Sequence, residues 1–133
     1  MLLESNNAEQ LCTTLSATPE DCAIIVTYSG STVRIQNEAQ LLHEKGVPII
    51  LLTGLGENAV RPYADYILDV TTRERLYSKV GNFSTNVSVQ LLQDILYSCY
   101  FAADFDKNWN TRLDIAHKIE LHRSSQNEIM REQ

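Results

Sequence analysis

The sequence predicts an α/β fold: a three-layer α/β/α sandwich with a short parallel sheet, doubly wound. Short apolar runs alternate along the chain with stretches whose apolar residues recur every three or four positions, as in strands separated by helices. Two of these runs are apolar at nearly every position, which favours strands covered by helices on both faces. At 133 residues the chain is long enough for one hydrophobic core.

Three segments are predicted as strands. Residues 22–28 and 47–53 are rich in β-branched residues, and the second run stops at Gly54. Residues 65–70 form a third and weaker run. Residues 1–4 are a candidate for the end of one more strand, so we expect a sheet of about four strands.

Helical periodicity is found between and after these runs, at residues 6–17, 31–45, 82–103 and 107–123, with a short helix before the third strand. The helix at 31–45 should bury Ile35, Ala39 and Leu42 and end at Gly46. The helix at 82–103 has an apolar stripe of Val87, Leu91 and Ile95, and its second half is apolar nearly all round. Such a helix must be covered on more than one side, so we expect a homodimer through it.

Composition excludes several classes of function. The 11 basic and 17 acidic residues give a net charge of −6, which repels nucleic-acid backbones. No apolar run approaches the ~18 residues of a membrane span. The three cysteines are widely spaced and predict free, buried thiols in a cytoplasmic protein, and the three histidines lie too far apart for a metal site. We expect no metal, no cofactor and no membrane contact.

The segment that points to chemistry runs from Thr27 to Thr32, between a predicted strand and a predicted helix. Ligands of open α/β sheets bind at the carboxyl ends of strands, and a helix N-terminus there attracts anions. Gly30 would let the backbone approach a ligand, and neutral hydroxyls surround it, on Thr27, Ser29, Ser31 and Thr32. The alternative is that these residues only turn the chain and cap the helix.

This segment, Thr27-Tyr28-Ser29-Gly30-Ser31-Thr32, resembles the S-x-S-G-x-T motif of SIS (sugar isomerase) domains, with a threonine at the first position. Residues 45–54 and 63–70 resemble the two strands that follow the motif in that family. Residues 88–97 resemble a helix of the SIS domains of RpiR/MurR-type transcriptional regulators. The resemblance covers residues 10–103 and implies a phosphosugar site made of Thr27, Tyr28, Ser29, Gly30, Ser31 and Thr32.

The resemblance implies that residues 1–123 form the phosphosugar-binding effector domain of an RpiR-type regulator, followed by a polar, disordered tail at 124–133. No residues match the first strand and loop of SIS domains, nor the helix-turn-helix domain of these regulators. We therefore expect an N-terminally incomplete SIS domain that contacts DNA only through a domain absent from this chain.

Glu74 follows the third strand, between Arg73 and Arg75. In SIS domains a glutamate near this point contacts sugar hydroxyls or serves as the base of an isomerase, so the resemblance implies a ligand role for Glu74. The alternative is a solvated acid with no ligand, and an arginine beside it could instead approach the phosphate. Two further functions stay open: an aldose/ketose phosphate isomerase with Glu74 as its base, and a dimerisation module without ligand.

Overall fold

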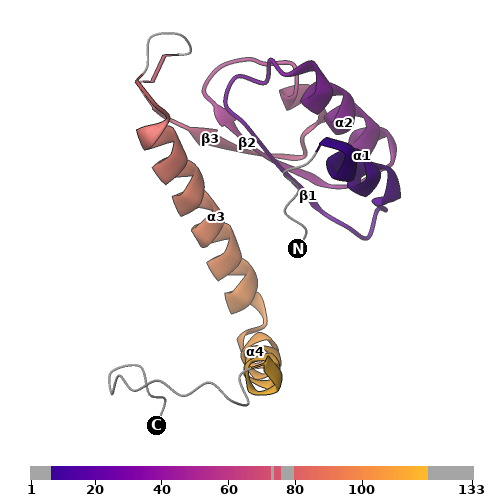
Figure 1. Ribbon diagram of the computed structural model, residues 1–133, viewed down its shortest axis with the longest axis vertical. Helices are drawn as coiled ribbons and strands as arrows, with labels where there is room; N and C mark the ends of the chain where they lie inside the picture. Colours follow the sequence, from indigo (N-terminus) through magenta and orange to yellow (C-terminus); the bar gives the residue numbers. More distant parts are fainter. Residues whose placement is uncertain (1–6, 73, 76–79, 120–133) are drawn as a thin grey trace. The chain divides into compact units, whose positions relative to one another are not determined.

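The computed structural model describes residues 7–72, 74–75 and 80–119. It divides into two units, residues 1–92 and 93–133. The first unit holds the sheet, the helices around it and the start of a long helix, and the second holds the rest of that helix and one more (Figure 1). The elements in chain order are α1 (Asn7–Ser16), β1 (Ala23–Thr27), α2 (Val33–Glu44), β2 (Ile49–Gly54), the 3-10 turn η1 (Arg61–Tyr63), β3 (Tyr66–Val70), α3 (Phe83–Ala103) and α4 (Phe105–Ile119).

The three strands pair in parallel in the order β1-β2-β3, with β2 in the centre. Thr27 of β1 pairs with Thr53 of β2, which in turn pairs with Asp69 of β3. Because the strands run in one direction, their carboxyl ends meet at one edge of the sheet. The predicted α/β class with a short parallel sheet is confirmed. The expected end of a fourth strand, at residues 1–4, lies outside the described residues.

One face of the sheet carries the core of the first unit. Its buried side chains form two groups: Ala39, Leu51 and Val60, and Leu42, Val47 and Ile49. Both connections between strands cover this face, because right-handed crossovers in the order β1-β2-β3 return on the same side. The predicted buried face of the second helix is confirmed, since Ala39 and Leu42 are buried and Ile35 packs against the group that contains Ala39.

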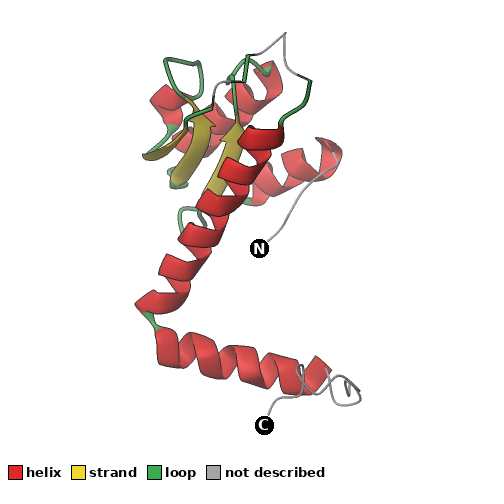
Figure 2. Cartoon of the chain, turned by 90° about the vertical axis from the view of Figure 1, so that its left-hand side faces the viewer, coloured by secondary structure: helices red, strands yellow, loops and turns green. Residues whose placement is uncertain are grey.

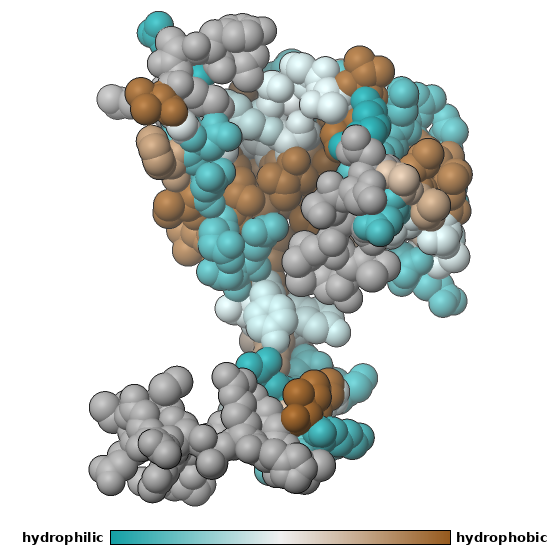
Figure 3. All heavy atoms as spheres, viewed as in Figure 1, coloured by the Kyte–Doolittle hydropathy of each residue, from teal (hydrophilic) through white to brown (hydrophobic). Residues whose placement is uncertain are grey.

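The opposite face of the sheet is only partly covered. Figure 2 shows the strands of the sheet together with the helices and loops of the chain. Leu52 and Val70 are buried, but Ile24 and Val26 of β1 are 50% and 44% exposed. Apolar atoms accordingly show at the surface over the strands (Figure 3).

The end of α2 is closed as predicted. Gly46 adopts a φ of +71°, which only glycine takes up readily, and its N–H donates to His43 O at 3.0 Å. Val47 N then donates to Leu42 O at 3.0 Å, so the chain leaves the helix directly into β2. The cap therefore fixes the point at which the core helix gives way to the central strand.

The long helix exposes its apolar stripe. Val87 and Leu91 are 69% and 58% exposed, and Ile95 is 47% exposed, so this chain alone does not provide the expected cover. In the second unit an aromatic series of Tyr97, Phe101, Phe105 and Trp109 runs from the end of α3 into α4, with ring centroids 5.6–6.1 Å apart. No described side chain of α4 is buried.

The remaining expectations agree with the structure to different degrees. The last helix begins at Phe105, two residues before its predicted start, and the predicted tail at 124–133 lies outside the described residues. The expectation of buried thiols is wrong for this chain, because Cys12, Cys22 and Cys99 are all exposed. Among the helices that the structure describes, none has the length and apolar character needed to cross a bilayer.

We expect Leu51→Ala to lower the free energy of unfolding by about 2–5 kcal/mol, because it opens a cavity under the central strand. Urea unfolding followed by circular dichroism measures this. The matched control is Leu55→Ala, since Leu55 stands just beyond the same strand and is 68% exposed. Equal effects of the two substitutions would contradict this description of the core.

Candidate functional site

The predicted Thr27–Thr32 turn lies at the carboxyl edge of the sheet. β1 ends at Thr27, and α2 begins at Val33 with Thr32 as its N-cap residue. Between them Gly30 has a φ of +62° and is buried, whereas Ser31 and Thr32 are exposed. The turn therefore presents hydroxyl groups to solvent directly above the first turn of a helix.

Local hydrogen bonds hold this turn. Gly30 N donates to Thr27 Oγ1 at 3.3 Å, and Ser31 N donates to Ser29 Oγ at 3.3 Å. Gln36, one turn into α2, reaches back and donates to Gly30 O at 2.8 Å. Thr32 makes no capping hydrogen bond with its side chain, so the α2 N-terminus lacks the usual internal acceptor. Unsatisfied N–H groups at a helix start are a ready site for an anion.

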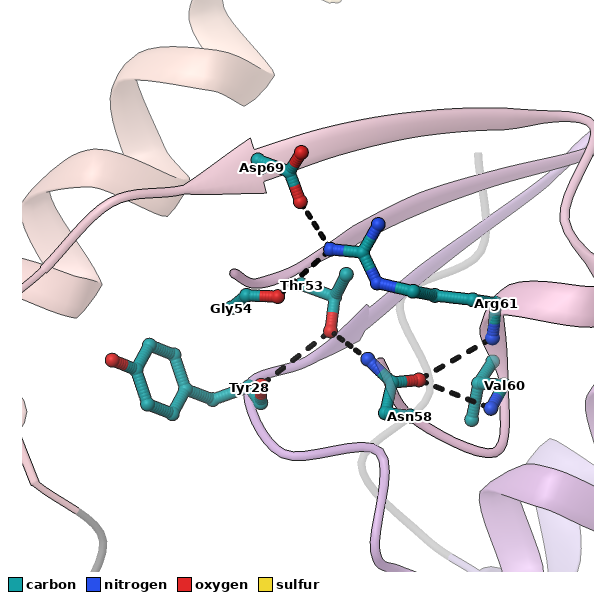
Figure 4. A network of polar contacts seen from close by, with 7 residues as sticks. All are labelled: Tyr28, Thr53, Gly54, Asn58, Val60, Arg61 and Asp69. Carbon is teal, nitrogen blue, oxygen red and sulfur yellow. Dashed lines mark hydrogen bonds and ion pairs between the residues drawn. The ribbon is translucent and has the colours of Figure 1, made fainter. Parts of the chain in front are cut away.

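The end of β2 supports the turn from below. Gly54 N donates to Tyr28 O at 3.0 Å, and Thr53 Oγ1 lies 3.4 Å from the same oxygen. A Cβ on Gly54 would lie 2.8 Å from Tyr28 O, so any side chain there would displace the backbone that leads into the turn. Asn58 adds to this support, because its Nδ2 donates a hydrogen bond to Thr53 Oγ1 at 2.9 Å (Figure 4).

The sequence interpretation missed Thr53, Gly54 and Asn58. A usable signal was present, because the rule that selects the carboxyl end of β1 applies equally to β2. Polar and glycine residues follow β2 directly, in Gly54-Leu55-Gly56-Glu57-Asn58.

Tyr28 belongs to the motif, but its hydroxyl reaches the segment after β3. It lies 2.8 Å from Thr72 Oγ1 and donates to Glu74 O at 3.1 Å. Thr72 Oγ1 lies in turn 3.4 Å from Thr85 Oγ1 of α3. A chain of hydroxyls therefore connects the strand that leads into the turn with the start of α3.

Glu74 caps α3. Its Oε1 accepts hydrogen bonds from Ser84 N at 2.7 Å and from Ser84 Oγ at 2.6 Å, and its Oε2 accepts one from Thr85 Oγ1. The Ser84 hydroxyl, followed by the Thr85 hydroxyl, lowers the pKa of Glu74 to about 2. A carboxylate also suits the positive end of a helix. Arg73 lies outside the described residues, and Arg75 is exposed.

The predicted site residues thus fall into two groups. Thr27, Ser29, Gly30, Ser31 and Thr32 form the turn above α2, and Tyr28 and Glu74 make their side-chain contacts around the start of α3. A group of three or more possible metal-ligating side chains is not found among the residues that the structure describes. The chemistry that the turn supports is the binding of an anion by neutral donors.

The fold and this turn define a class: an α/β domain with a hydroxyl-rich turn at the carboxyl edge of a parallel sheet. The model of the SIS-domain family matches residues 4–98. The chain belongs to the SIS-domain family.

Two curated relatives are described as uncharacterised HTH-type transcriptional regulators. The one from Thermotoga maritima is 26% identical over 89 residues, which are 67% of this chain and 31% of that protein. The one from Clostridium perfringens is 29% identical over 79 residues, which are 59% of this chain and 28% of that protein. The chain thus matches less than a third of the length of either relative.

A solved structure shares the fold. The Vibrio vulnificus NanR protein, determined in complex with ManNAc-6P, superposes with a TM-score of 0.74 at 18% identity. The match covers 92% of this chain and 46% of NanR. The chain therefore shares its fold with part of NanR.

We expect Glu74→Gln to destabilise the chain most near neutral pH. Above about pH 4.5 the carboxylate is ionised in both the folded and the unfolded chain, so its hydrogen bonds to α3 contribute fully. As the pH falls from about 4.5 towards about 2, the unfolded chain takes up the proton first, and this stabilisation is lost.

The difference in unfolding free energy between the wild type and Glu74→Gln should therefore shrink with acid. Urea unfolding at several pH values between about 7 and 3 measures it. Glu57→Gln is the control, because Glu57 is an exposed acid in the loop after β2. A difference that stays constant over this range would contradict the capping role.

Proposed function

We propose that this chain is the phosphosugar-binding part of a transcriptional regulator of the RpiR type, with a sugar phosphate bound at the Thr27–Thr32 turn. Membership of the SIS family, the description of two relatives as HTH-type regulators and the phosphosugar in the NanR complex support the proposal. The phosphate would accept hydrogen bonds from the hydroxyls of Ser29, Ser31 and Thr32 and from N–H groups at the start of α2.

The turn is the observation that carries this proposal. Gly30 is buried at positive φ, so the backbone is folded tightly while Ser31 and Thr32 stay exposed at an uncapped helix start. The chain as a whole has a net charge of −6 and does not attract phosphates at long range. Specific neutral donors at one point suit a small phosphorylated ligand better than a polyanion.

The isomerase alternative is less well supported. A general base works best when its pKa lies near the operating pH, and the hydrogen bonds from Ser84 and Thr85 hold the pKa of Glu74 at about 2. A carboxylate in that state is a weak proton acceptor. Glu74 instead fixes the start of α3, and we propose that any contact it makes with a sugar is through hydrogen bonds alone.

We further propose that the protein is a cytoplasmic homodimer that pairs through residues 82–103. The apolar stripe of α3 supports this, since Val87, Leu91 and Ile95 would lose their exposure to water against a second copy. DNA would be bound by a domain outside residues 1–133. The sugar phosphate would act by favouring one arrangement of the dimer, which requires different ligand affinities in the two arrangements.

Thermal unfolding with a panel of phosphosugars tests the site. The panel contains ManNAc-6P, other hexose 6-phosphates, the matching free sugars and inorganic phosphate. A ligand that binds only the folded chain stabilises it by about 2.7 kcal/mol at one hundred times its dissociation constant. We expect the midpoint to rise with one phosphosugar and not with its free sugar.

The rise should be lost in the double variant Ser29→Ala/Thr32→Ala, which removes two hydroxyls from the turn. The matched control is Ser98→Ala/Thr111→Ala, which removes two exposed hydroxyls from α3 and α4. A chain that responds to no phosphosugar would favour the ligand-free dimerisation module. A response that survives the Ser29/Thr32 substitutions would place the ligand elsewhere.

A further inference from the structure

Asn58, in the loop after β2, lies against Gly30 in the middle of the turn. A Cβ built on Gly30 would lie 2.4 Å from Asn58 Oδ1, 2.6 Å from its Cγ and 2.8 Å from its Cβ. The carboxamide therefore occupies the space where a side chain of residue 30 would stand. The position of Gly30 is limited by Asn58 as well as by its own positive φ.

Three hydrogen bonds fix the position of the Asn58 carboxamide. Nδ2 donates to Thr53 Oγ1 at 2.9 Å, and Oδ1 accepts from Val60 N at 3.0 Å and from Arg61 N at 3.3 Å (Figure 4). Thr53 is fully buried at the end of β2. The side chain that lies against Gly30 is thus held by the central strand and by the start of η1, and not by the turn itself.

The far end of the same loop is also tied down. Arg61 Nη2 donates to Gly54 O at 3.0 Å and forms an ion pair with Asp69 of β3. The end of the loop that carries Asn58 is therefore attached both to β2 and to β3. A loop held in this way can keep Asn58 at a fixed position between the edge of the sheet and the turn.

We propose that Asn58 is a positioning residue for the phosphosugar site. It acts through Gly30, by holding the turn where the hydroxyls and N–H groups at the start of α2 can converge on one phosphate. This inference rests on the proposed function. The alternative is that Asn58 only caps η1, by accepting hydrogen bonds from Val60 N and Arg61 N, and has no effect on the turn.

Two substitutions test these roles. Asn58→Ser keeps a small oxygen that can cap η1, but it removes the carboxamide from beneath Gly30. Asn58→Asp keeps the shape and the capping oxygen, but it places a negative charge against the turn. If Asn58 is only a cap, Asn58→Ser should bind phosphate compounds as the wild type does, whereas the charge of Asn58→Asp would repel them in either case.

The test combines the urea unfolding midpoint with calorimetric titration of inorganic phosphate and of the panel compound that stabilises the wild type most. We expect Asn58→Ser and Asn58→Asp to keep a near-native midpoint and to bind both compounds at least ten-fold more weakly. Asn37→Ser, an exposed asparagine of α2, is the matched control and should change neither quantity.

Native affinity in Asn58→Ser would overturn the inference. Loss of binding in Ser29→Ala/Thr32→Ala together with native affinity in Asn58→Ser would refute the positioning role and leave the proposed site intact. If the wild type itself binds none of these compounds, the proposed function and this inference both fail.

Discussion

The parallel pairing of β2 with both of its neighbours is the constraint on which the rest of the structure depends. It aligns Thr27, Thr53 and Asp69 across the three strands, so that the segments leaving the strands meet at one edge. Burial of β2 between core and partner strands keeps this alignment in place, since Ile49, Leu51 and Leu52 have almost no exposure. The turn at Gly30, the loop at Asn58 and the segment before α3 all leave from this edge.

Close packing of the backbone determines which chemical groups this edge of the sheet exposes. At Gly30 and Gly54 a Cβ would collide with Asn58 and with Tyr28 O, so the turn and the ends of the strands lie nearer to each other than side chains would allow. The groups that remain at the surface of the turn are hydroxyls and N–H groups, and none of residues 27–32 carries a charged side chain. An acidic protein can in this way hold one phosphate without becoming a general binder of polyanions.

Residues that act on near neighbours were predictable, and residues that act across the fold were not. The strands, the turn at Gly30 and the helix end at Gly46 follow from local sequence and were predicted within two or three residues. The ligand role of Glu74 was inferred from the family resemblance. Its capping of α3 was not predicted, because Ser84 and Thr85 lie ten and eleven residues away and meet it only through tertiary structure. Asn58 was missed although it follows the carboxyl end of β2, and only its approach to Gly30 depends on tertiary structure.

Nuclear magnetic resonance of the ¹⁵N-labelled chain, titrated with a phosphosugar, tests most directly whether the carboxyl edge is the binding site. If it is, the backbone amides from Ser29 to Arg34 should show the largest shift changes, saturating with the same dissociation constant as calorimetry gives. Amides of α4 should stay unchanged in the same titration. Saturable binding with its largest shifts outside the turn, while the amides from Ser29 to Arg34 stay still, would contradict the account.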